Sequence, residues 1–438
     1  MINHRSTYDK IHTMKHVPPP LPTIASLAWL SFALALTPSA LAADFLMPGI
    51  QAKAAAGAGQ TVSRGATSMY FNPANLSTAR GVQPEIDLSM AQITYTYQNS
   101  DTGTYVPAVL TATTPLASLG LAWKPIPQLV LGLAMLPLGN GSAQVDNGVP
   151  AQITPGTIEA SNVTRKQTAF RAAVGSSVQF NKMFAIGVSL LYYSDQSKVT
   201  LVKSGTDRVT LNADYKGTSK QYVFGTRLNL PYSVTVGLSY KTAATRPYAG
   251  TLAVNTASSN ATEPNFQNQD FKGVGFDPAQ IGFGIEGRVG HVGAFFDFVR
   301  EKWSAGRTTY KQGLGTDGDA TDFIDTNDIT VGARVWLTPQ HRLEAAFGMD
   351  GGNMRAGDPV DTTSNKFPSV RGVRIGQLEA VPRNIFSGGY RYSTGRSSYI
   401  EMAAVYMYGA LLVPDGFYQP GTYSLKVIMG SAGVSYSF

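Results

Sequence analysis

Residues 169–180 read AFRAAVGSSVQF, and apolar and polar side chains alternate along this stretch. Phe170 and Val174 fall on one face, whereas Arg171 and Gln179 fall on the other. A period of two is typical of a strand, because successive side chains of a strand point to opposite faces of its sheet. The stretch therefore predicts a strand with one apolar face and one polar face.

The same alternation recurs from residue 83 to the C-terminus and predicts fourteen strands. Their expected bounds are 83–97, 115–125, 128–137, 167–180, 184–198, 213–230, 233–245, 276–287, 290–303, 326–337, 341–350, 383–393, 398–409 and 424–438. Most of these segments reach the roughly 9–11 residues that a tilted strand needs to cross a bilayer. The pattern thus favours strands that span a membrane.

The connections between these strands alternate in length, and this decides the fold class. Short turns are expected at 126–127, 181–182, 231–232, 287–290, 338–340 and 394–397, with long connections between the other strand ends. Such a layout is typical of an outer-membrane barrel whose termini both lie in the periplasm. We therefore expect an all-β fold, a 14-stranded antiparallel transmembrane β-barrel over residues 83–438, in the outer membrane of a Gram-negative bacterium. A soluble sandwich is the alternative, but it would leave many apolar faces without a second sheet to cover them.

The composition agrees with a barrel. Of the 438 residues, 43% are hydrophobic and 14% are charged, against roughly 25% charged in an average soluble domain. A closed barrel pairs its backbone groups internally and so needs no long apolar run. The charge is expected on the lumenal face, at Arg171, Arg227, Lys241, Glu286, Arg288, Asp297, Glu301, Arg334, Glu344 and Glu401.

Several functional classes are disfavoured by the same composition. After residue 42 no run approaches the roughly 20 apolar residues of a membrane helix. The chain has no cysteine, which excludes disulfides, thiolate metal sites and cysteine nucleophiles. The net charge of +7 comes from scattered basic residues, so nucleic acid is not an expected partner. No metal site, catalytic residue or cofactor is predicted.

The N-terminus resembles a secretory leader. An apolar run at 24–36 follows Lys10 and Lys15 and precedes Ala40-Leu41-Ala42, which predicts a signal peptide over residues 1–42 that is cut after Ala42. An uncleaved anchor is the alternative, but the run is too short to span a bilayer. Translation could start at Met1 or at Met14, since Met14 would begin a leader of ordinary length.

Residues 43–82 do not alternate and cannot form another strand. A barrel of fourteen strands should enclose a lumen that needs closing, because eight strands are filled by their own side chains whereas 16–18 enclose an aqueous channel. We therefore expect residues 43–82 to form a hatch inside the lumen, with one or two short helices. A disordered periplasmic tail is the alternative, but the segment is more apolar than disorder usually allows.

One motif in this segment carries a family resemblance. Residues 65–76 read GATSMYFNPANL and contain Asn72-Pro73-Ala74, which resembles the hatch motif of the FadL family of outer-membrane transporters for hydrophobic compounds. Three further pieces, 131–139, 237–241 and 297–304, resemble strands of that family in the same order. The chain ends on an outward aromatic pair, Tyr436 and Phe438, which resembles the assembly signal that the barrel-assembly machinery recognises.

The resemblance implies passive uptake of a hydrophobic small molecule, such as a long-chain fatty acid or an aromatic hydrocarbon, by a monomeric barrel surrounded by outer-membrane lipid. It implies capture at extracellular loops, an N-terminal trigger at Ala43, Asp44 and Phe45, and lateral release through a kink in the third strand. That kink would lie at Leu136, Pro137, Leu138 and Gly139. Pro137 supports a bulge or a strand end independently, because proline cannot donate to a ladder.

Three other functions stay open on the sequence. A general diffusion porin for water-soluble solutes fits the charged lumen but gives the N-terminal segment no role. A barrel enzyme would need a base beside its nucleophile, yet His291 and His341 are expected beside short periplasmic turns. Adhesion through the long loops is the third possibility. Loop 199–212 is short and loop 246–275 is polar, so the identity of the substrate stays open as well.

Overall fold

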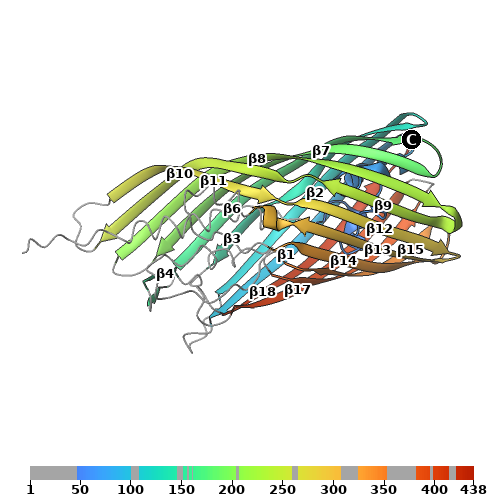
Figure 1. Cartoon of the computed structure of the whole chain (residues 1–438). Coiled ribbons are helices and arrows are strands. Elements are labelled where there is room, and N and C mark those ends of the chain that lie inside the picture. Colours follow the sequence, from blue (N-terminus) through green and yellow to red (C-terminus); the bar gives the residue numbers. More distant parts are fainter. Residues whose placement is uncertain are drawn as a thin grey trace, which may run out of the picture.

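The computed structural model describes residues 47–99, 108–145, 151–154, 157–159, 161–203, 207–258, 265–306, 324–352, 381–394, 398–413 and 421–438. These residues form a closed, 14-stranded antiparallel β-barrel (Figure 1). The fold class predicted from the alternation is therefore confirmed.

The barrel strands follow the chain order. They are β1 (Val82–Asn99), β2 (Ala108–Ile126), β3 (Leu129–Val145), β6 (Ser161–Gln179), β7 (Phe184–Lys203), β8 (Asp207–Leu230), β9 (Val234–Lys241), β10 (Ala244–Ser258), β11 (Asn265–Asp277), β12 (Ala279–Val289), β13 (Val292–Lys302), β14 (Thr326–Trp336), β15 (His341–Asp350), β16 (Arg383–Ser393), β17 (Tyr399–Val413) and β18 (Gly421–Ser435). β9 and β10 are two pieces of one barrel strand, because both pair with β8. β11 and β12 are two pieces of the next strand, because β11 pairs with β10 and β12 pairs with β9. β4 (Ala151–Thr154) and β5 (Thr157–Glu159) form a separate hairpin.

Pairing between the first and last strands closes the barrel. β1 and β18 run antiparallel, with Glu85 opposite Ser435 and Asn99 opposite Gly421. The C-terminus lies at the end with the short turns, which is the periplasmic end of an outer-membrane barrel. Among the described strands, closure leaves each strand with a neighbour on both sides, and the barrel backbone is paired within the protein except where β2 and β3 separate.

Several strands extend further toward the extracellular end than predicted. β2 begins at Ala108 instead of residue 115, and β8 begins at Asp207 instead of residue 213. The polar loop expected at 246–275 is largely strand, because β10 and β11 pair from Ala244 opposite Asp277 to Thr256 opposite Asn265. Outside the bilayer both faces of a hairpin meet water, so these extensions lack the alternation that reveals a membrane strand.

The strand faces predicted to point toward lipid and toward the lumen are confirmed. Phe170 and Val174 are 38% and 53% exposed on the outside of the barrel, whereas Arg171 is buried on the lumenal side. Eight of the ten charged residues expected in the lumen are buried. The exceptions lie near strand ends: Arg288 is exposed beside a periplasmic turn, and Glu301 is half-buried at the extracellular end of β13.

Residues 47–81, called the lumenal segment below, pack inside the barrel (Figure 1). They contain a helix, α2 (Ile50–Ala54), and two short 3₁₀ helices, η2 (Ala66–Tyr70) and η3 (Pro73–Thr78). Two further 3₁₀ turns, η4 (Pro231–Ser233) and η5 (Trp303–Ala305), lie outside this segment. None of the helices in the described ranges is long and apolar enough to cross a membrane.

Candidate functional site

The Asn72-Pro73-Ala74 motif ties the lumenal segment to the barrel wall. Asn72 is fully buried and caps the N-terminus of η3, where its Oδ1 accepts a hydrogen bond from the Ala74 amide at 3.1 Å. Its Nδ2 donates to the carbonyls of Gln60 and Thr226, both at 2.9 Å. One side chain therefore caps a helix, holds a second part of the segment and binds β8.

Inward-facing glycines, which have no side chain, let the lumenal segment lie directly against the backbone of the barrel wall. At Gly187, Gly225 and Gly237 an added Cβ would collide with Pro73, Asn72 and Gln60, respectively. Gly187 and Gly225 are register partners on β7 and β8. These three residues, called the glycine seat below, form a flat surface on which the motif rests.

Two carboxylates fix the remainder of the segment. Asp297 of β13 accepts hydrogen bonds from the Gly59 and Gln60 amides at 2.6 and 2.7 Å through one oxygen, Oδ2. Lys53 of α2 forms a buried ion pair with Asp87 of β1. Burial lowers the pKa of the Lys53 ammonium, and the charge of Asp87 opposes that shift.

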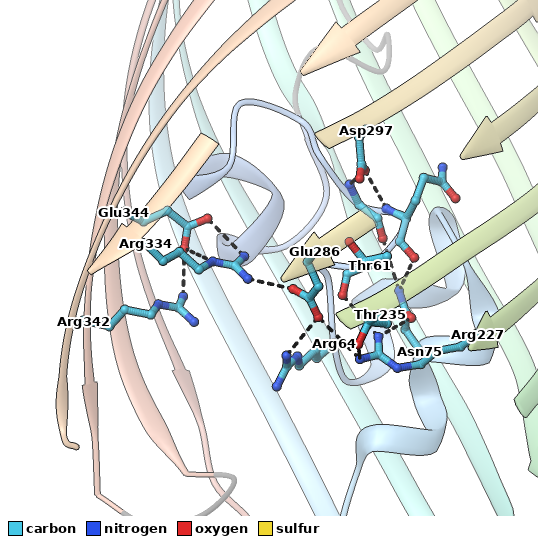
Figure 2. A network of polar contacts seen from close by, with 12 residues as sticks. Thr61, Arg64, Asn75, Arg227, Thr235, Glu286, Asp297, Arg334, Arg342 and Glu344 are labelled. Carbon is cyan, nitrogen blue, oxygen red and sulfur yellow. Dashed lines mark hydrogen bonds and ion pairs between the residues drawn. The ribbon is translucent and has the colours of Figure 1, made fainter. Parts of the chain in front are cut away.

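A network of arginines and glutamates lies on the periplasmic side of the segment (Figure 2). Glu286 accepts from Arg334 at 2.9 Å and from Arg64 of the segment at 3.3 Å. Arg334 also binds Glu344, and the chain of pairs continues through Arg342 to Glu401 and Arg391. Arg227 adds hydrogen bonds to Asn75 and to the Thr61 carbonyl. Buried charges of this kind are stable only when paired, as they are here.

A cavity of about 140 Å³ lies on the extracellular side of the segment. Its floor includes Met47, Tyr70 and Phe71 of the segment, and Phe276 and Trp303 contribute to its wall. Lys241 also lines it, with its ammonium 3.7 Å from the centre of the Tyr70 ring. The cavity thus combines aromatic surface with charged groups.

Beside the cavity, the lumenal face of β17, β18, β1 and β2 becomes apolar toward the extracellular end. On β17 the inward side chain Glu401 is followed by Ala403, Val405 and Met407. The apolar wall, as we call it below, is formed by Ile93, Leu116, Val405, Met407, Leu425, Val427 and Met429. Met47 of the segment packs in the same cluster and also lines the cavity. Apolar surface therefore runs from the cavity to this wall.

β3 is irregular on both edges around residues 136–143. Its pairing with β2 shifts register between Leu119 opposite Met135 and Thr111 opposite Gln144. Its pairing with β6 shifts between Leu138 and Gly141. The predicted kink residues Leu136, Pro137, Leu138 and Gly139 lie at this interruption, which Pro115 of β2 also flanks. Both prolines lack the N–H that a ladder would use.

The remaining predicted site residues lie at the two ends of the chain. Ala43, Asp44 and Phe45 fall outside the described residues. Tyr436 and Phe438 are 52% and 77% exposed at the periplasmic rim, with ring centres 4.8 Å apart in an edge-to-face arrangement. Their proposed recognition by the assembly machinery stays a prediction.

Some residues of the site were not predicted from the sequence, because their contact partners are distant in the chain. The glycine seat, the Lys53 to Asp87 pair and the aromatic lining at Trp303 were not predicted as parts of the site. One signal was available: Gly187, Gly225 and Gly237 all fall on the lumenal face of strands with clear alternation. Small residues on that face indicate close approach of another backbone.

Comparison with known proteins identifies the fold. No family model and no curated sequence is recognisably similar to the chain. A FadL homologue from Pseudomonas aeruginosa is 12% identical with a TM-score of 0.66, covering 89% of this chain and 98% of that one. The chain has the FadL-type barrel fold. The toluene transporter TodX from Pseudomonas putida is 13% identical with a TM-score of 0.64, covering 89% of this chain and 98% of that one. The monoaromatic hydrocarbon channel CymD is 16% identical with a TM-score of 0.56, covering 90% of this chain and 98% of that one.

The FadL-type barrel has the outer surface of a membrane protein. Large apolar side chains are exposed on its outside, among them Leu88, Leu133, Met402 and Ile428. Such a surface is stable in hydrocarbon and unfavourable in water. The chain is therefore an outer-membrane-type transmembrane barrel.

Neither of the two histidines in the described residues lines the cavity. His291 is exposed beside a periplasmic turn, and His341 contacts the Tyr390 hydroxyl at 2.7 Å. Within the described ranges, no group of three or more histidine, aspartate or glutamate side chains is arranged to hold a metal ion. The three compared structures are a FadL homologue, a transporter and a channel.

Proposed function

We propose that this barrel is a passive outer-membrane channel for the uptake of hydrophobic molecules, such as fatty acids or aromatic hydrocarbons, and is not an enzyme. The observation that carries the proposal is the apolar wall. A lumen built for water-soluble solutes would be polar throughout, whereas Val405, Met407, Val427 and Met429 line this one. Apolar surface favours a hydrophobic solute by roughly 25 cal/mol for each Å² removed from water.

The geometry supports a route in two stages. A molecule that enters from the extracellular end reaches the cavity above Phe71 and Met47 and then the apolar wall. Leu116 of that wall lies on β2, next to the interruption between β2 and β3. We propose that the molecule leaves sideways there into the membrane, because the paired charges below the lumenal segment disfavour an apolar path to the periplasm. Toluene and other monoaromatic hydrocarbons are the solutes named for TodX and CymD.

We further propose that the first residues of the mature chain gate the cavity. Met47 lines the cavity and Ile50 packs against Gly433 of β18. Deleting residues 43–50 should lower uptake of a labelled hydrocarbon or fatty acid by cells that express the barrel, without lowering the amount of folded barrel. Equal uptake by the truncated and complete proteins would contradict the gate.

A general diffusion porin is the main competing function. Planar-bilayer recording separates the two, because a barrel closed by the lumenal segment should show little steady ion conductance. A large steady conductance of the unmodified protein would favour the porin.

A further inference from the structure

The exposed charges on the outside of this barrel are mostly positive. Among the residues whose exposure the structure describes, the charged residues that are exposed as a whole are lysines and arginines, and one carboxylate, Asp214, has a side chain that is 43% exposed. The carboxylates are buried or half-buried, mostly on the lumenal side. This separation is not explained by transport through the lumen.

Six of these cations lie beyond the extracellular edge of the apolar surface. We call them the basic collar: Lys198 of β7, Lys216 and Lys220 of β8, Arg300 and Lys302 of β13, and Lys426 of β18. On the outer faces of β8 and β18, exposed apolar residues come first, and a cation lies two residues further toward the outside. On β13, Arg300 lies two residues beyond Phe298, which is half-buried.

The spacing sets the depth of the collar. On β8, Lys220 lies two residues closer to the extracellular end than Tyr222, which is 50% exposed. On β18, Lys426 lies two residues closer to that end than Ile428, which is 48% exposed. Two residues of a strand advance by roughly 6.6 Å. These ammonium groups therefore stand one step above the hydrocarbon, at the level of lipid headgroups, and long basic side chains can extend further outward from there.

The collar carries excess positive charge even after its ion pairs are counted. Lys198 binds Asp214 at 3.1 Å, and Arg300 binds Asp325 at 3.6 Å. Within the described residues, the other four cations of the collar form no ion pair. Lys216 and Lys220 lie four residues apart on the same outward face of β8.

We propose that the basic collar binds phosphate groups of an anionic glycolipid in the outer leaflet, and so anchors the barrel at a fixed depth. Charge complementarity and position together favour this occupant. Cations at headgroup depth beside an apolar surface fit a ligand with acyl chains below and phosphates above. The inference is independent of what the lumen transports.

The test measures binding of fluorescent diphosphoryl lipid A to the full-length mature barrel in a neutral detergent. The variant K216Q/K220Q/K426Q should bind at least tenfold more weakly than the unmodified barrel. A matched control, R80Q/K182Q/R288Q, removes the same charge from the periplasmic end and should bind as the unmodified barrel does. Heat-dependent gel mobility verifies that all three proteins are folded.

Three further measurements use the same assay. The variant K216R/K220R/K426R should retain binding, since it keeps the charge. Binding to the unmodified barrel should weaken steeply as sodium chloride is raised, because salt screens exposed charges. Inorganic phosphate at the concentration of the lipid should not compete, since it has no acyl chains.

Equal losses in the two glutamine variants, or no loss in either, would overturn the proposal. Binding that is insensitive to salt would do the same. Full competition by inorganic phosphate would point to a free-phosphate site in place of a lipid site and would equally count against it.

Discussion

The side-chain amide of Asn72 donates to the backbone carbonyl of Thr226 at 2.9 Å, deep inside the barrel. This bond joins the lumenal segment to β8 beside the glycine seat. Because the same amide also binds the Gln60 carbonyl, one residue couples two turns of the segment to one strand. The seal of the lumen should therefore depend on Asn72 more than on any residue next to it.

Replacing Asn72 with alanine should loosen the lumenal segment and leave the barrel assembled. The change removes a helix cap and two buried hydrogen bonds, which together stabilise the docked segment by about 2–3 kcal/mol. We expect this variant to show a larger steady ion conductance in planar bilayers than the unmodified barrel. Asn327→Ala, at an exposed position of β14, is the control, and an equal conductance of both variants would argue against a sealing role for Asn72.

Gly225→Ala tests the glycine seat by steric means. An added Cβ would overlap the Asn72 side chain, and overpacking of this kind costs about 1–3 kcal/mol. We expect faster hydrogen exchange in residues 66–78, measured by mass spectrometry. Gly430→Ala on β18 is the matched control, because no atom lies within 4 Å of its added Cβ. Unchanged exchange at 66–78 in the Gly225 variant would mean that the segment does not rest on β8 in solution.

The sequence predicts the barrel well where lipid and lumen act on opposite faces of a strand. β15 and β16 have the predicted bounds, and β14 differs from its prediction by one residue. Prediction fails for β10 and β11 beyond the membrane, where both faces meet water and no alternation is required. The family resemblance located Asn72, but Thr226 is 154 residues away, and a register that brings them together depends on the closed barrel. The contacts of Gly225 with the lumenal segment could not be predicted for the same reason, since they too depend on the closed barrel.

The ion pair between Lys53 and Asp87 should hold α2 against β1. Lys53→Met leaves a buried carboxylate without its partner, which destabilises docking by about 3–5 kcal/mol. We expect residues 50–54 to become sensitive to hydrogen exchange. The double variant K53M/D87L removes both charges and should recover most of the protection, since a paired charge can be exchanged for apolar packing. If the double variant is as exposed as the single one, the lysine acts through its packing and the ion pair is dispensable.

The interruption between β2 and β3 should be the exit for the transported molecule, and a disulfide can close it. Continuing the register of Leu119 opposite Met135 would place Ser118 opposite Leu136, and both side chains are buried on the lumenal side. The chain has no cysteine, so S118C/L136C gives a single cross-link that non-reducing gels can follow. Because the cross-link holds the two strands together, oxidation should reduce uptake of a labelled hydrocarbon at least tenfold, and dithiothreitol should restore it.

The control is A173C/L191C, at a register pair of the uninterrupted β6–β7 ladder, which should transport equally in both redox states. Full uptake through the oxidised S118C/L136C barrel would show that the molecule leaves by another route.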